Sequence, residues 1–176
     1  MAKLIRAVAW RKIERPYTRK SKFRKKSFVR AVPHNKVVKY ETGNLQKKFP
    51  HTVQLRSKGD IQIRHNAIES GRLTSNRYLE KKLGKIGYKL KVCIFPHHIL
   101  RNNPLASGAG ADRMSTGMKM SFGKSVGLAA QVRKGQILFQ ASVDKSNLEV
   151  AKTAMNRAKY KMPCSCTLSY KEEPIT

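Results

Sequence analysis

The first 36 residues carry thirteen Lys and Arg side chains and a single acid, Glu14, for a net charge of +12. Their apolar residues follow neither the period of a strand nor that of a helix, so this segment buries little surface by itself. We expect residues 1–36 to form an extended basic arm that orders along RNA phosphates, with aromatic rings available for stacking. A solvated, disordered basic tail is the alternative that remains open.

The whole chain shows the same imbalance, with 38 Lys and Arg against 10 Asp and Glu, or a net charge of +28 in 176 residues. This excess favours a nucleic-acid partner, although charge alone does not distinguish RNA from DNA. A hydrophobic content of 40% is sufficient for one core. No apolar run approaches the ~18 residues of a spanning helix, and no secretory signal is evident. With only three cysteines, we expect a cytoplasmic protein without a membrane partner.

Residues 37–172 have the patterns of a single packed domain, and residues 173–176 are expected to form a loose tail. Alternating apolar residues predict strands at 37–40, on either side of a turn at 57–60, and at 86–95, 126–132, 136–143 and 164–170. The two strands around the turn form either a β-hairpin or two consecutive strands.

Two capping-box patterns predict helix starts. Asn66 with Glu69 begins a helix that ends at Gly84 and leaves Arg72 on its outer face, and Ser146 with Glu149 begins a second helix. The order of strands and helices indicates an α+β fold.

Residues 102–122 lack apolar periodicity and are rich in Gly and Ala, which predicts a long loop. Loops of about 20 residues in a compact domain are mostly functional or disordered. Gly108 and Gly110 permit close backbone approach to a ligand, and Asp112 with Arg113 forms a charge pair or a turn. The flanking cations are Arg101, Arg113, Lys119, Lys124, Arg133 and Lys134. A merely solvated surface loop is the alternative.

Motifs for catalysis or metal binding fail on spacing. Gly123–Lys124–Ser125 resembles the end of a P-loop, but five residues separate Gly117 from Gly123 where the signature needs four. Cys164 and Cys166, one residue apart, suit a strand in the core better than a zinc knuckle. No carboxylate pair and no nucleophile with a base partner is evident. We therefore expect no enzyme activity, no cofactor and no metal.

Several blocks resemble the universal large-subunit ribosomal protein family called L-sixteen in bacteria and L-ten-e in archaea and eukaryotes, and most closely its archaeal branch. They are Arg15–Pro16–Tyr17–Thr18–Arg19, the helix from Ala67 to Arg77, Ile94–Phe95–Pro96–His97–His98–Ile99–Leu100–Arg101, the run from Gly108 to Arg113, Gly117–Met118, and Phe122–Gly123–Lys124. The resemblance implies a hammerhead-type fold with two helices packed on an antiparallel sheet. It also implies binding to large-subunit rRNA near the central protuberance and the transfer-RNA corridor.

The resemblance further implies that the loop at 102–116 approaches the peptidyl-transferase and transfer-RNA region. Neighbouring ribosomal proteins are then expected partners, and no small-molecule substrate is. The expected phosphate contacts are Arg6, Arg11, Arg15, Arg19, Lys20, Arg24 and Lys25 in the arm, with the six flanking cations at the loop. A stand-alone nucleic-acid architectural or chaperone protein is the main rival, and an enzyme that uses the Gly-rich loop is a more distant one.

Overall fold

The computed structural model describes residues 6–14, 21–29, 31–103 and 123–172. Its strands are β1 (Glu41–Gly43), β2 (His51–Ser57), β3 (Ile61–Arg64), β4 (Tyr88–Val92), β5 (His98–Asn102), β6 (Lys124–Val132), β7 (Ile137–Val143) and β8 (Cys166–Glu172). The helices are α1 (His65–Leu83) and α3 (Leu148–Lys159), with short 3-10 turns η1 (Ala7–Trp10), η2 (Arg24–Lys26) and η3 (Lys145–Asn147).

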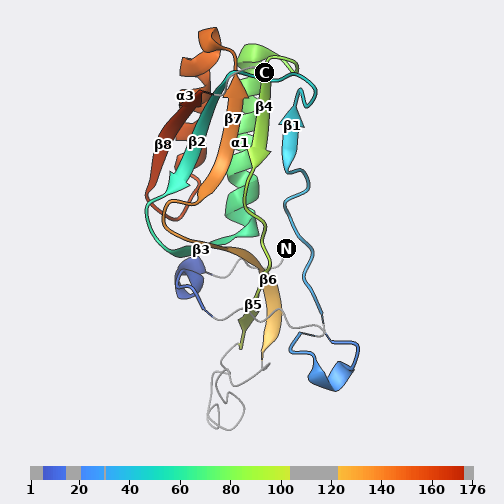
Figure 1. The fold of residues 1–176 in the computed structure, drawn as a ribbon. Helices are drawn as coiled ribbons and strands as arrows, with labels where there is room; N and C mark the ends of the chain where they lie inside the picture. The colour runs from blue at the N-terminus through green and yellow to red at the C-terminus, as the bar shows by residue number, and fades with distance from the viewer. Residues whose placement is uncertain (1–5, 15–20, 30, 104–122, 173–176) are drawn as a thin grey trace.

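These strands form two antiparallel sheets, one in the order β1-β4-β7-β2-β8 and one in the order β3-β6-β5. Both α-helices pack on the same side of the five-stranded sheet and contact each other, while the three-stranded sheet projects from one end (Figure 1). The predicted class, α+β with two helices on an antiparallel sheet, is confirmed. We call β3, β5 and β6, together with residues 6–14 that pack on them, the small lobe.

The core lies between the helices and the five-stranded sheet. Tyr88, Leu90 and Val92 alternate toward it from β4, as predicted, and are at most 4% exposed. Helix α1 contributes its narrow apolar stripe, in which Ile68 and Leu79 are fully buried. The predicted C-terminal glycine is also confirmed, because Gly84 follows the last turn with a φ of +68°.

Two chain segments cross between the sheets at the same place. β2 pairs with β7 and β8, whereas β3 pairs with β6, so the segment at 57–60 joins two sheets and does not close a hairpin. The predicted hairpin is therefore wrong, and the alternative of two consecutive strands is correct. The backbone of Ser57 exchanges hydrogen bonds with Gly135 and Gln136, which pairs the two crossing segments.

Local details differ from the sequence-based expectations. The predicted N-caps are wrong, because α1 begins at His65, before Asn66, and α3 begins at Leu148, after Ser146, and neither helix has a side-chain cap. Glu69 instead bonds the buried Arg72, and Glu149 bonds Lys152. Arg72 is only 7% exposed, so its predicted outward position is wrong. The strand expected at 37–40 occurs instead at β1, and β5 was not predicted.

Candidate nucleic-acid interface

Two of the predicted RNA-contacting cations lie at the same end of the small lobe. In the antiparallel pairing of β5 with β6, Arg101 lies opposite Ser125 and Asn102 lies opposite Lys124. Lys124 is exposed and Arg101 is half-buried. Because successive residues of a strand point to opposite faces, these two side chains project from the two faces of this end of the sheet.

The first part of the arm is attached to the small lobe by hydrogen bonds to its backbone. The side-chain amide of Gln62 on β3 donates to the carbonyls of Trp10 and Lys12, and its backbone N–H donates to the Arg11 carbonyl at 2.9 Å. Gln131 lies opposite Gln62 on β6 and donates to the carbonyl of Glu14. These bonds hold the backbone at the sheet and leave the Arg11 side chain exposed.

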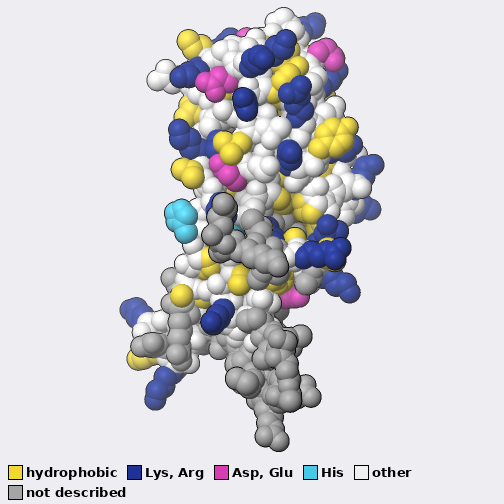
Figure 2. Space-filling view, turned by 180° about the vertical axis from the view of Figure 1, so that it is seen from behind, with side chains coloured by type: hydrophobic (Ala, Val, Ile, Leu, Met, Phe, Trp, Pro, Cys, Tyr) yellow, Lys and Arg dark blue, Asp and Glu magenta, His cyan; other side chains and the backbone are white. Residues whose placement is uncertain are grey.

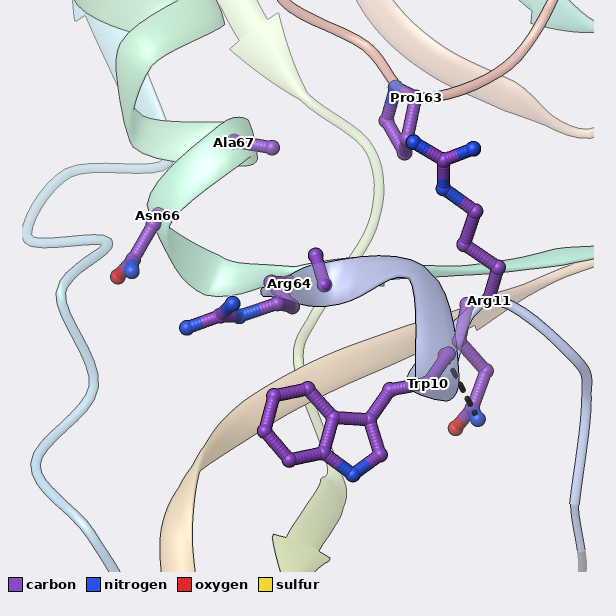
Figure 3. Close-up of a pocket in the computed structure, with 8 residues that line it drawn as sticks. Trp10, Arg11, Arg64, Asn66, Ala67 and Pro163 are labelled. Carbon is purple, nitrogen blue, oxygen red and sulfur yellow. Dashed lines mark hydrogen bonds between the residues drawn. The ribbon is translucent and has the colours of Figure 1, made fainter. Parts of the chain in front are cut away.

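Trp10 connects three parts of the lobe. Its indole Nε1 donates to the Arg101 carbonyl on β5 at 3.2 Å, and the guanidinium carbon of Arg64 lies 5.3 Å from the ring centre. Figure 3 shows Trp10 and Arg64 side by side, with Arg11 extending from the same turn toward Pro163. Such a cation–aromatic pair contributes roughly 0.5–2 kcal/mol.

The second described part of the arm contacts the lobe through an apolar residue. Val29 is 7% exposed and forms a small core with Ile99 of β5 and Leu128 of β6. The exposed Lys25 belongs to the preceding turn, η2, which lies on the other side of the lobe from η1 (Figure 1). Residues 6–14 and Val29 thus pack on the lobe, and the binding of the arm to RNA stays a prediction.

Arg133 and Lys134 lie at the opposite end of β6 from Lys124. Arg133 lies nine positions beyond Lys124 along extended chain, a distance of roughly 30 Å at about 3.3 Å per residue. At that end Asp60 accepts a hydrogen bond from the Lys134 backbone N–H at 2.7 Å and pairs with the Arg133 guanidinium at 3.5 Å. The structure therefore does not group these two cations with Arg101 and Lys124.

Carboxylates in the described part of the chain are largely used within the protein. Ion pairs with Lys or Arg engage Glu41, Asp60, Glu69, Asp144 and Glu149. Figure 2 shows the helix-bearing face, where Lys and Arg side chains are spread widely and Asp and Glu are few. This excess of cations adds to the long-range positive field that attracts a polyanionic partner to the molecule.

Two histidines that border the lobe are buried and neutral. Burial, with the charges of Lys36 and Arg64, lowers the pKa of His65 to about 4, and its Nδ1 accepts a hydrogen bond from the Lys36 backbone N–H at 3.4 Å. Burial also lowers the pKa of His98, which is 3% exposed. Both imidazoles are therefore uncharged at neutral pH and do not add to the positive charge of this part of the protein.

The cysteines follow the predicted arrangement in part. Cys166 is buried in β8, whereas Cys164 precedes that strand and is half-buried against the core, so the predicted strand start at 164 is wrong. Their Sγ atoms are 3.5 Å apart. Among the described residues, no group of three His, Cys, Asp or Glu side chains is placed to hold a metal ion. The helices in the same residues are all too short or too polar to cross a bilayer.

Sequence reasoning missed the residues that attach the arm. Gln62 and Gln131 each have apolar neighbours on both sides in a strand. This pattern was the one sequence feature that could have indicated that their side-chain amides are covered by another segment of the chain. Several predicted site residues lie outside the described residues: Arg15, Arg19, Lys20, Gly108, Gly110, Asp112, Arg113 and Lys119, as does the side chain of Arg24.

Comparison with known proteins agrees with this architecture. The profile of the family described as "Ribosomal protein L16p/L10e" matches residues 16–169, which is most of the chain. The chain belongs to the L16p/L10e family of ribosomal proteins. It is a structural constituent of the ribosome and not an enzyme. Membership of this family confirms the prediction of a cytoplasmic ribosomal component. Its partners are rRNA and other ribosomal proteins.

The L16p/L10e relatives include archaeal proteins named "Large ribosomal subunit protein uL16". The protein from Methanococcus aeolicus is 49% identical over 160 residues, covering 90% of this chain and 89% of that protein. The protein from Archaeoglobus fulgidus is 44% identical over 154 residues, covering 88% and 85%. The predicted similarity to the archaeal branch of the family is confirmed.

Proposed function

We propose that this L16p/L10e chain binds large-subunit rRNA through its small lobe and basic arm, near the central protuberance and the transfer-RNA corridor. The placement of Arg101 and Lys124 on consecutive residue pairs at the same end of β5 and β6 is the observation that carries this proposal. Cations held on a sheet neutralise phosphates with little loss of backbone freedom.

The segment at 102–116 then approaches the peptidyl-transferase and transfer-RNA region, with Gly108, Gly110, Asp112 and Arg113 as its transfer-RNA-proximal residues. The sequence block from Ile94 to Lys124, which carries the most specific resemblance to the family, supports this assignment. Transfer RNA is in this view a transient partner, and rRNA and neighbouring ribosomal proteins are permanent ones.

Cells that depend on a variant lacking residues 103–115 provide the test. We expect the variant to sediment with large subunits through a sucrose gradient after a high-salt wash, because Arg101, Lys124 and the arm remain. Translation by those subunits should be impaired. Normal translation would contradict the role of the segment, and recovery of the full chain at the top of the gradient would contradict stable rRNA binding.

A further inference from the structure

A cavity of about 220 Å³ lies between η1, the start of α1 and the segment before β8. Its walls include Ala7, Trp10, Arg11, Arg64, Ala67 and Pro163 (Figure 3). Drug-sized ligands occupy pockets of roughly 300–1,000 Å³, so this cavity suits a smaller group such as one planar ring system.

The chemistry of the walls combines apolar surface with positive charge. Two alanine methyl groups and the Pro163 ring offer nonpolar contact, while Arg11 and Arg64 are the charged residues among the described walls. No acid is found among the described residues that line the cavity. A ligand that complements it has a flat, weakly polar body joined to an anionic chain, which is the chemistry of a nucleotide in single-stranded RNA.

The wall formed by η1 is fixed before any ligand arrives. Gln62 bonds the carbonyl of Trp10, and the Trp10 indole bonds the carbonyl of Arg101, so this turn is held from two strands. A cavity that exists without the ligand costs little conformational entropy to fill.

We propose that this cavity receives a single nucleobase extruded from rRNA, with the flanking phosphates near Arg11 and Arg64. The proposal rests on the proposed rRNA binding and adds to it a site for one unstacked base. Trp10 is the only tryptophan of the chain, so tryptophan fluorescence reports on the part of the small lobe that contains the cavity.

The test compares two synthetic seven-residue RNAs: a strand of abasic riboses with a single adenosine at its centre, and the same strand with an abasic ribose at every position. With the full chain, we expect the adenosine strand to quench Trp10 fluorescence and to bind about tenfold more tightly than the abasic strand, an effect of the order of one stacked base. The abasic strand retains the phosphates and measures their contribution separately.

Ala67→Leu fills the cavity without changing its charge. In this variant the tenfold preference should disappear, while affinity for the abasic strand stays the same. Ala7→Leu fills the cavity from the other side and is used if Ala67→Leu alters thermal unfolding. Ala31→Leu, at an exposed alanine, is the matched control and should retain the preference.

Equal binding of both strands by the unaltered chain would overturn the base site and leave rRNA binding intact, as expected if the cavity instead takes an apolar side chain from a neighbouring protein. Preference retained in both filled variants would also overturn it. Failure of the full chain to bind large-subunit rRNA would contradict the proposed function itself.

Discussion

The side-chain amide of Gln62 donates a hydrogen bond to the backbone carbonyl of Trp10 at 3.2 Å and thereby joins two residues 52 positions apart. Gln62 is only 2% exposed, so the arm covers it. A segment with no periodicity of its own becomes ordered here because strand β3 supplies donors to its backbone. The arm is thus partly a layer of the small lobe.

Gln62→Leu should release residues 6–14 from the lobe. The substitution removes two donated hydrogen bonds and leaves the carbonyls of Trp10 and Lys12 without them, at a cost of about 1–2 kcal/mol. Hydrogen exchange and limited proteolysis should show faster exchange and cleavage in residues 6–14, with a lower urea midpoint. The exposed Gln46→Leu should change neither measurement, and equal protection in both variants would refute the attachment.

Two ion pairs of the same spacing should differ widely in their contribution to stability. Glu69 bonds Arg72 at 2.9 Å with both side chains largely buried, whereas Glu149 pairs with Lys152 in solvent. Glu69→Ala leaves a buried guanidinium without its carboxylate and should cost about 3–5 kcal/mol, against less than about 1 kcal/mol for Glu149→Ala. Urea denaturation of both variants measures this difference, and similar costs would contradict it.

The buried pair of Glu69 and Arg72 illustrates a kind of contact that the sequence did not predict. Alternation revealed β4, and the glycine stop revealed the end of α1, because both depend on local patterns. The capping boxes failed because α1 begins one residue before Asn66 and α3 begins two residues after Ser146. Glu69 pairs instead with Arg72, a contact that a propensity rule does not include. The turn at 57–60 has hairpin composition, yet β2 and β3 separate because their partners, β7 and β6, come 65 to 92 residues later.

The sequence also predicted only part of the nucleic-acid interface. Arg101 and Lys124 lie next to the two ends of the segment at 104–122 in the sequence, which was sufficient to place both at the same end of the sheet. Arg133 is near in sequence but lies at the other end of β6, since an extended strand carries it away. Gln62 has no feature in the sequence that links it to residue 10.

Gly71→Ala should destabilise the protein even though alanine favours helices. A Cβ at Gly71 would lie 2.8 Å from the Met162 Cε and 3.1 Å from the Phe139 Cζ, so the core must shift. We expect a cost of about 1–3 kcal/mol by thermal unfolding. Gly59→Ala meets no atom within 4 Å and serves as the control; a gain in stability at Gly71 would show that the helix and sheet are farther apart.

Stability should fall as the pH decreases from about 6.5 to 4. His65 has a pKa near 4 when folded and an ordinary value near 6.5 when unfolded, so the unfolded chain binds the proton first. The loss is on the order of 3 kcal/mol and is complete below pH 4. His65→Gln should flatten the urea-denaturation profile over this range, whereas the exposed His97→Gln should not. If the free energy of unfolding of His65→Gln falls with pH as steeply as that of the unaltered chain, another titrating group causes the loss of stability.

The salt dependence of binding to large-subunit rRNA tests the central claim most directly. Each neutralised phosphate adds roughly 0.7–0.9 to the slope of log affinity against log salt concentration. Replacing Arg101 and Lys124 with alanine should therefore weaken binding and lower that slope by about 1.4–1.8. The control replaces Lys81 and Lys82, which are exposed at the far end of α1, and should leave the slope unchanged. An identical slope in both double variants would contradict RNA binding by the end of the small lobe.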